Sequence, residues 1–296
     1  MGFGVGGGTD SFSRSAGRAL AAILENPVQV QNYPAGGGVA AYRELLARPA
    51  DGCTLLALTS DYVVYDNAFP ELVDLSKLAY LVRSHREAGL LLARKLESDG
   101  TAAETDNEKR SGVSFSSLVT RARAEQRTLK VGGTGARSFD RAAIDYAFSG
   151  GEIAYRYIPY AGSKTMLMDL LGGRLDLIYD EFGSTKSLIE SGSIVPVVAF
   201  AHRVEDLPTP APLAAVAGLN TPPPIWRGFV VHGATKPSLV EQLLAALDGA
   251  LNSEDYLRFE KERGLYAPDE RLLGEQFQAS IQGESAMFRA SARSVE

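Results

Sequence analysis

The sequence is short of the residues that most disulfide and metal sites require. Its 296 residues include one cysteine, Cys53, and three histidines, His85, His202 and His232. A single cysteine excludes an intrachain disulfide and a cysteine-rich metal site. We expect Cys53, inside the apolar run CTLLAL, to be a buried and inert thiol. The histidines lie far apart without HExxH spacing, so we expect three unrelated surface or loop residues and no metal site.

The chain also lacks the patterns of nucleophilic catalysis. It contains no GxSxG elbow, and three scattered histidines supply no Ser-His-Asp arrangement. Asp180 and Glu181 are adjacent carboxylates at the end of an expected strand, where consecutive side chains point to opposite faces. They therefore do not form an acid–base pair, and we expect no catalytic residue. One of them, Asp180, is instead a candidate acceptor for a hydrogen-bond donor on a ligand.

Excess positive charge and long apolar runs are missing as well. A net charge of −6 and a pI near 5.3 argue against a nucleic-acid partner. No run approaches the roughly 18 apolar residues of a membrane-spanning helix. The first residues, MGFGVGGG, fit neither a secretory signal peptide nor the myristoylation pattern. Taken literally, these features predict a cytoplasmic protein.

What the chain does contain is a repeated alternation of strand and helix patterns separated by glycine-rich turns. The turns fall at residues 6–8, 34–38, 132–135 and 159–163. The alternation predicts an α/β protein with mainly parallel sheets and a helical C-terminal part. One expected strand contains Val28 and Val30, and the polar stretch 97–112 is expected to be a surface insertion.

A glycine turn that opens a helix is suited to bind an anion. The first backbone amides of a helix have no intrahelical acceptor, and the helix dipole places partial positive charge beside them. Glycine lets an anion approach the backbone closely because no Cβ stands in the way. Because the device recurs in both halves of the chain, the sequence favours one small anionic ligand held from two sides of a cleft.

Two other interpretations of these turns stay open. Residues 2–7 spell GxGxxG, the dinucleotide-binding pattern, although no strand precedes it and no acidic residue follows the next strand. Residues 162–165 resemble the end of a P-loop but lack its upstream glycine. A nucleotide-dependent α/β enzyme using Gly2–Gly7 is therefore the alternative, and ordinary tight turns remain the simplest explanation of any single site.

Several motifs in order along the chain resemble one known family. They are GGGTD at 6–10, NxPxGGG at 32–38, Asp51-Gly52 before TLLAL, PYAGS at 159–163 with LLGGRLDLIYD, and WRGF at 226–229. Together they resemble the substrate-binding proteins of tripartite tricarboxylate transporters, the Bug family. The chain departs from the family pattern at Val5, usually proline, and at PAGGG, usually PGAGG.

The resemblance implies a two-lobed, type II periplasmic-binding-protein fold whose lobes close on a carboxylate ligand. Lobe 1 would comprise residues 1–96 and 228–296, and lobe 2 residues 97–227. The ligand-binding residues that the resemblance implies are Gly7, Gly8, Thr9, Asp10, Ala35, Gly36, Gly37 and Ser60 in lobe 1, and Gly133, Thr134, Ser138, Gly162 and Ser163 in lobe 2. It further implies a periplasmic, non-enzymatic protein without a cofactor, which delivers a small organic acid to the membrane subunits of a transporter. We expect a monomer.

Side chains outside the glycine turns would select the ligand. Arg137 and Arg227 could each clamp a second carboxylate through two parallel hydrogen bonds. Candidate walls for an apolar ligand body are Tyr62, Tyr65, Phe139 and Trp226. An Asp180 that faced the ligand would repel a second carboxylate and favour a hydroxyl- or amino-bearing ligand.

Overall fold

The structure is a computed structural model that describes residues 1–95, 113–151, 153–201, 209–265 and 271–292. The described chain divides into two compact units. Unit 1 contains residues Met1–Glu87, Arg137–Phe139 and Ile225–Glu296, and unit 2 contains Ala88–Ala136 and Asp140–Pro224. The insertion expected at 97–112 and the surface position expected for His202 lie outside the described residues.

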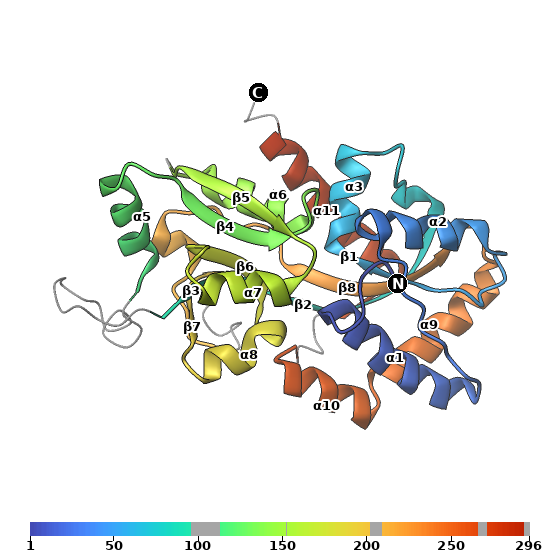
Figure 1. Ribbon diagram of the computed structural model, residues 1–296. Coiled ribbons are helices and arrows are strands. Elements are labelled where there is room, and N and C mark those ends of the chain that lie inside the picture. The colour runs from blue at the N-terminus through green and yellow to red at the C-terminus, as the bar shows by residue number, and fades with distance from the viewer. Residues whose placement is uncertain (96–112, 152, 202–208, 266–270, 293–296) are drawn as a thin grey trace. The chain divides into compact units, whose positions relative to one another are not determined.

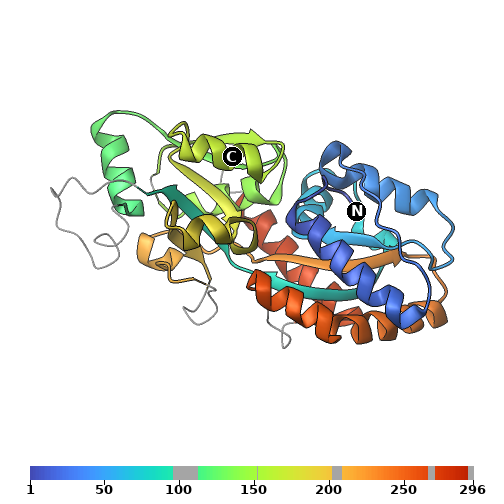
Figure 2. The ribbon, with the colours of Figure 1, turned by 60° about the horizontal axis from the view of Figure 1, so that its bottom comes forward.

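Unit 1 is built on a four-stranded sheet in the order β1-β8-β2-β9 (Figure 1). The strands are β1 (Leu56–Thr59), β8 (Ile225–His232), β2 (Leu78–Glu87) and β9 (Leu272–Leu273). Its α-helices are α1 (Gly8–Leu24), α2 (Val39–Ala47), α3 (Ser60–Ala68), α9 (Pro237–Leu251), α10 (Glu254–Arg263) and α11 (Gly274–Ala292), with short 3-10 helices η1 (Ala35–Gly38) and η2 (Leu75–Lys77). Figure 2 shows α1, α9 and α10 packed beside one another on this unit.

The core of unit 1 joins these helices to the sheet. Phe12 and Leu20 of α1, spaced at helical periodicity, are 1% and 4% exposed and pack with Leu81 of β2 and Leu247 of α9. This burial fixes α1 on the sheet and thereby fixes where its first turn lies.

Unit 2 is built on a five-stranded sheet in the order β5-β4-β6-β3-β7. The strands are β3 (Gly89–Arg94), β4 (Leu129–Thr134), β5 (Tyr155–Tyr160), β6 (Leu177–Glu181) and β7 (Ile194–Phe200). The helices are α5 (Phe115–Ala124), α6 (Phe139–Phe148), α7 (Ser163–Leu171), α8 (Phe182–Glu190) and η4 (Ala214–Ala217). Leu90, Leu92, Met166, Leu170 and Ile178 form its core.

The α/β class is confirmed, but the prediction of mainly parallel sheets is wrong. Among the described strands, all pairs in unit 1 are antiparallel, and in unit 2 the parallel pairs are those of β4 with β5 and with β6. The reason lies in which strands become neighbours. β8, from late in the chain, lies between β1 and β2 and runs antiparallel to both, and β3 lies between β6 and β7 and runs antiparallel to both.

Three local expectations are also wrong. Cys53 is exposed because the run CTLLAL enters β1 only at Leu56. His85 is fully buried on β2, whereas His232 is half-buried at the end of β8. The segment containing Val28 and Val30 is not assigned as a strand.

Candidate functional site

The first turn of α1 presents free backbone amides, as the sequence predicts. Gly7 is the N-cap residue and no side chain caps the helix. The first amide with a helical acceptor is that of Ser11, which donates to the Gly7 carbonyl at 3.0 Å. Among the described residues, no acceptor is found for the amides of Gly7, Gly8 and Thr9. These three donors, together with the helix dipole, can bind an anion.

Asp10 organises this turn with its side chain. Its carboxylate accepts hydrogen bonds from the Gly6 amide (2.9 Å), Arg14 Nε (3.0 Å) and Asn32 Nδ2 (2.9 Å). Burial opposes ionisation, but the bonds from Arg14, Asn32 and Gly6 outweigh it and lower the pKa of Asp10 to about 2. The carboxylate expected to contact the ligand therefore holds the loop together, and Asn32 ties it to the second glycine turn.

The second turn has a backbone that only glycine adopts easily. Gly36, Gly37 and Gly38 have φ values of +66°, +63° and +101°. A Cβ on Gly37 would collide with the Tyr65 hydroxyl, and one on Gly2 would lie 2.5 Å from the Gly38 Cα. The chain start and the second turn therefore touch. Ala35, Gly36 and Gly37 are exposed, so their backbone is open to a ligand.

The aromatic residues expected to wall the ligand belong to the packed interior of unit 1. Tyr62, Phe139 and Trp226 are at most 1% exposed, and Tyr65 is 7% exposed. The Tyr62 hydroxyl donates to the Gly38 carbonyl at 2.9 Å, so this ring supports the second turn from beneath.

Arg227, a candidate clamp for a ligand carboxylate, is engaged inside the protein in this structure. It is 6% exposed, and its Nε donates to Thr9 Oγ1 at 3.1 Å. Its Nη1 donates to Glu87 Oε1 at 2.6 Å. Because Thr9 Oγ1 accepts from Arg227, the Thr9 hydroxyl proton is directed to another acceptor, and none is found for it among the described residues.

Around Arg227 lies a buried polar cluster that sequence reasoning missed. It contains Glu87 and His85, whose Nε2 lies 3.9 Å from Glu87 Oε1. Burial, reinforced by Arg227 and other arginines, lowers the pKa of His85 well below its usual value, so the ring is neutral. Alternating residues on a strand could have suggested that these two side chains share a face. Ser60, 1% exposed, accepts from the Trp226 amide at 3.5 Å.

The segment Arg137–Phe139 belongs to unit 1, although the sequence placed it in the second lobe. The Phe139 amide donates to Asp61 Oδ1 at 2.9 Å, at the first turn of α3. Arg137 is exposed, and its guanidinium lies 4.7 Å from the centre of the Phe69 ring. Ser138, between them, is 7% exposed.

In unit 2 the third glycine turn is held from within. The amide and hydroxyl of Thr134 both donate to Asp140 Oδ2 at 2.8 Å. A Cβ on Gly133 would lie 2.6 Å from the Tyr157 hydroxyl, which donates to the Gly135 carbonyl. Thr134 therefore stabilises the turn with the side chain that was expected to face a ligand.

Asp180 is the most unusual residue of unit 2. Its Oδ1 accepts from the Glu181 amide (2.8 Å) and Ser184 Oγ (2.5 Å), while its buried Oδ2 has no hydrogen-bond donor among the described residues. Burial raises the pKa of Asp180 to about 6, although the hydroxyls of Ser184 and Ser163 act against it. Ser163 begins α7 after Gly162, and no side chain caps that helix. The structure thus brings Gly162, Ser163 and Asp180 together within unit 2.

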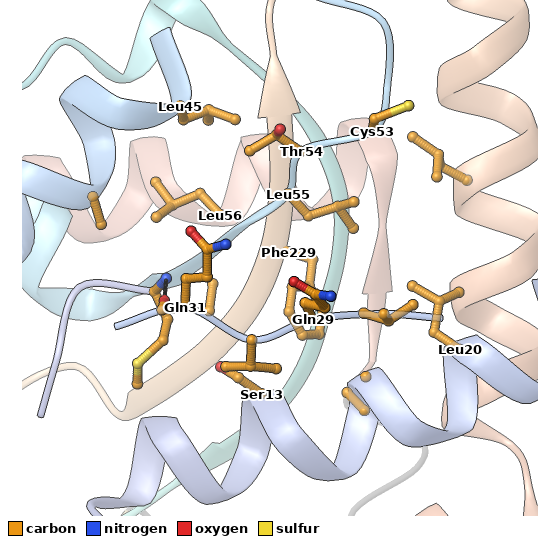
Figure 3. A pocket seen from close by; sticks show the side chains of 18 of the residues that line it. Ser13, Leu20, Gln29, Gln31, Leu45, Cys53, Thr54, Leu55, Leu56 and Phe229 are labelled. Atoms are coloured by element: carbon orange, nitrogen blue, oxygen red, sulfur yellow. Dashed lines mark hydrogen bonds between the residues drawn. The ribbon is translucent and has the colours of Figure 1, made fainter. Parts of the chain in front are cut away.

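A cavity of about 590 Å³ lies elsewhere in unit 1, among α1, α2 and β1 (Figure 3). None of the candidate ligand-binding residues lines it. Within the described ranges there is no cluster of His, Cys, Asp or Glu that could hold a metal, and no helix long and apolar enough to cross a membrane.

Comparison with known proteins identifies the family. Residues 12–287 match the tripartite tricarboxylate transporter family receptor. A UPF0065 protein of the tcbD-tcbE intergenic region of a Pseudomonas species is 25% identical over 266 residues, covering 89% of this chain and 76% of the relative. BugT of Bordetella pertussis is 25% identical over 258 residues, covering 85% and 75%.

Solved structures share the fold. MatC from Rhodopseudomonas palustris with bound malate has a TM-score of 0.82 at 21% identity, covering 98% of this chain and 96% of that one. The periplasmic binding protein BugD has a TM-score of 0.81 at 19% identity, covering 98% and 95%. The nucleotide-dependent enzyme is not supported, since Gly2 of its expected motif is buried against Gly38. The chain belongs to the receptor family of tripartite tricarboxylate transporters and is a two-lobed solute-binding protein, not an enzyme.

Proposed function

We propose that this protein captures a small organic carboxylate and that unit 1 binds its acid group at the first turn of α1. The observation that carries the proposal is the set of free amides at Gly7, Gly8 and Thr9. A carboxylate accepts several hydrogen bonds, and a helix N-terminus supplies them with a favourable dipole. Among related folds, MatC was solved with malate and another R. palustris protein with adipate.

The Thr9 hydroxyl adds a fourth donor to this group. Arg227 donates to its oxygen, which orients the hydroxyl proton away from Arg227. The exposed backbone of Ala35, Gly36 and Gly37 completes the proposed seat, because Gly38 and the chain start touch. A nucleotide phosphate is a poorer candidate, since Gly2 of the GxGxxG pattern is buried against Gly38.

We also propose that residues of unit 2 contact the ligand. They are Gly133, Thr134, Gly162, Ser163 and Asp180, and from the segment joined to unit 1, Arg137 and Ser138. The unpaired Asp180 Oδ2 suits a hydroxyl or amino donor. We also propose that the protein is a monomer and delivers its ligand to the membrane subunits of a transporter. We further propose a periplasmic location, like that given for BugD.

The experiment measures binding to a panel of carboxylates that includes malate and adipate. Ligand at a hundred times its Kd stabilises the folded state by about 2.7 kcal/mol, which a thermal-shift assay detects. The test variant is Gly7→Val, because Gly7 has φ −78° and ψ 176°, which valine adopts, and its Cβ would have only the Gly4 carbonyl nearby, at 3.8 Å. We expect the variant to fold and to lose binding at least tenfold.

Gly283→Val, at an exposed helical glycine with open space around its Cβ, is the matched control and should bind normally. Stabilisation of the wild-type protein by NAD or ATP and by no organic acid would contradict the proposed ligand class. Equal affinity in wild type and Gly7→Val would remove the first turn of α1 from the site.

A further inference from the structure

Arg137 is an exposed arginine in the short segment that belongs to unit 1. The segment is anchored there, because the Phe139 amide donates to Asp61 Oδ1 at 2.9 Å. The Arg137 guanidinium lies over the Phe69 ring, 4.7 Å from its centre, and no hydrogen bond or ion pair is found for it among the described residues. A cation–π contact holds the side chain in place but uses none of its five N–H donors. Arg137 therefore presents a positioned positive charge with free donors.

Tyr65 places a hydroxyl donor beside this arginine. Its ring is 7% exposed and also lies against Phe69, with the two ring centres 6.1 Å apart. Within the described part of the chain the Tyr65 hydroxyl has no hydrogen bond, and it does not belong to the polar atoms sealed inside the fold. Burial, reinforced by Asp61, raises the pKa of Tyr65, while Arg137 acts against it. The hydroxyl therefore keeps its proton at neutral pH and can donate it to an acceptor.

The second glycine turn borders the same hydroxyl. A Cβ on Gly37 would overlap the Tyr65 oxygen, so the hydroxyl rests directly on this turn. Gly36 and Gly37 are exposed, and no acceptor is found for their amides among the residues that the structure describes. Successive amides in such a turn form a concave surface that attracts anions. Three separate segments of unit 1 thus direct an amide, a hydroxyl and a guanidinium to one neighbourhood.

The first turn of α1 already offers enough donors for one acid group. The amides of Gly7, Gly8 and Thr9 and the Thr9 hydroxyl have no acceptor in the described ranges. An ionised carboxylate has about four lone-pair positions, so these donors can satisfy it fully. The donors of Tyr65 and Arg137 are therefore available to a second acid group of the same ligand.

We propose that Arg137 and Tyr65 are specificity-determining residues that bind this second acid group, so that unit 1 by itself carries the subsites for both ends of a dicarboxylate. The inference rests on the proposed function, because the first acid group occupies the first turn of α1. A guanidinium matches a carboxylate with two parallel hydrogen bonds, and the tyrosine hydroxyl adds a third. A ligand that ends in a methyl or an ammonium group gains none of these bonds, and an ammonium group is also repelled by Arg137.

The experiment compares acids that differ only at the second end. Calorimetry measures the affinity of the wild-type protein for butyrate against succinate and for hexanoate against adipate. We expect the diacid of at least one pair to bind about tenfold more tightly than its monoacid, since charge-assisted hydrogen bonds have this strength. Arg137→Gln should abolish that preference by weakening the diacid about tenfold while leaving the monoacid unchanged. Tyr65→Phe should weaken the diacid several-fold and likewise spare the monoacid.

Salt gives a readout that a purely structural role would not change. Diacid affinity should fall more steeply with ionic strength in the wild-type protein than in Arg137→Gln. Arg258→Gln, at an exposed arginine of α10, makes the same change in net charge and should leave both affinities unaltered. Both test variants should fold, because Arg137 is exposed and the Tyr65 hydroxyl has no bond to lose within the described chain.

The outcomes separate this inference from the proposed function. Equal affinity for monoacids and diacids, in a wild-type protein whose binding is lost in Gly7→Val, would overturn the inference and leave the proposed function intact. Equal loss of both kinds of acid in Arg137→Gln would also overturn it, because the arginine would then act on the first acid group or on the fold. Absence of binding to every organic acid would overturn the proposed function and this inference together.

Discussion

Asn32 shows how a single side chain can set the geometry of an anion-binding turn. Its Nδ2 donates to Asp10 and to the Phe3 carbonyl at 3.0 Å, while its Oδ1 accepts from Arg14. One amide therefore connects the first helix turn, the chain start and the strand-like segment before the second glycine turn. A residue with both donor and acceptor is needed for this role, which excludes aspartate and leucine alike.

Asn32→Ala should raise the pKa of Asp10 from about 2 toward 3.8, because one of the bonds that stabilise the ionised form is lost. The lowered pKa in the wild-type protein stabilises the fold above pH 4, and that stabilisation is lost as the pH falls toward 2. Carboxyl-carbon NMR titration of Asp10 measures the shift directly. An unchanged titration midpoint would show that Arg14 and Gly6 suffice to hold the carboxylate.

Arg227 offers a second test at this scale, because it has separate partners on two atoms. Arg227→Lys keeps a charge for Glu87 but loses the Nε donor to Thr9, so we expect a folded protein whose carboxylate affinity falls several-fold. Arg227→Met should instead destabilise the fold by about 3 kcal/mol, because it leaves Glu87 buried without this partner. Chemical denaturation and calorimetric binding separate the two effects. Loss of stability without loss of affinity in the lysine variant would contradict the role given to Thr9.

At the scale of elements, the second glycine turn allows two costs of an alanine substitution to be measured separately. One is the cost of a left-handed backbone, and the other is the cost of a steric clash with a neighbouring side chain. Gly36 and Gly37 have nearly the same φ, but a Cβ on Gly36 would lie 3.4 Å from Val39, whereas one on Gly37 would overlap the Tyr65 hydroxyl. Gly36→Ala should cost about 1 kcal/mol for its left-handed backbone, and Gly37→Ala should cost more. Tyr65→Phe should recover part of the Gly37→Ala loss and none of the Gly36→Ala loss. Urea unfolding of the wild-type protein, the three single variants and the two double variants measures these costs. Equal costs with no recovery would show that the turn rearranges.

Element patterns explain what could be predicted from the sequence and what could not. The glycine turns marked the start of α1 correctly because cap chemistry is local. The direction of strand pairing was missed because it depends on which strands become neighbours, as β8 does between β1 and β2, and strand patterns do not encode their partners. Val28 and Val30 alternate with polar residues as in a strand, but among the described residues no strand pairs with them. The segment is therefore extended without being a strand.

The site was less predictable than the elements, for a related reason. Residue type identified polar candidates, but only the fold decides whether a polar group faces a ligand or another part of the protein. Asp10, Thr134 and Arg227 are all engaged internally, and the buried His85 and Glu87 lay in a strand that looked purely structural.

At the scale of the whole molecule, buried carboxyl groups with raised pKa values make stability fall as the pH rises. Burial raises the pKa of Asp180 in unit 2 to about 6, and burial raises that of Glu284 in unit 1 to about 7. An acid whose pKa is higher in the folded state binds more protons there, so its ionisation destabilises the fold above the unfolded pKa. This sign is opposite to that of Asp10, whose stabilising contribution is complete above about pH 4 and is lost as the pH falls toward 2.

Asp180→Asn should therefore flatten the pH dependence of unit 2 between pH 4 and pH 6. The shift from 3.8 to about 6 corresponds to at most about 3 kcal/mol of destabilisation that develops across this window. Amide exchange at β6, corrected for intrinsic rates, reports the local opening free energy at each pH. Glu284→Gln is the matched control, because it removes a buried carboxyl of unit 1. It should flatten the pH dependence of the opening free energy at β8 more than at β6. A wild-type β6 whose opening free energy does not change from pH 4 to pH 6 would mean that Asp180 ionises as readily in the folded state as in the opened state.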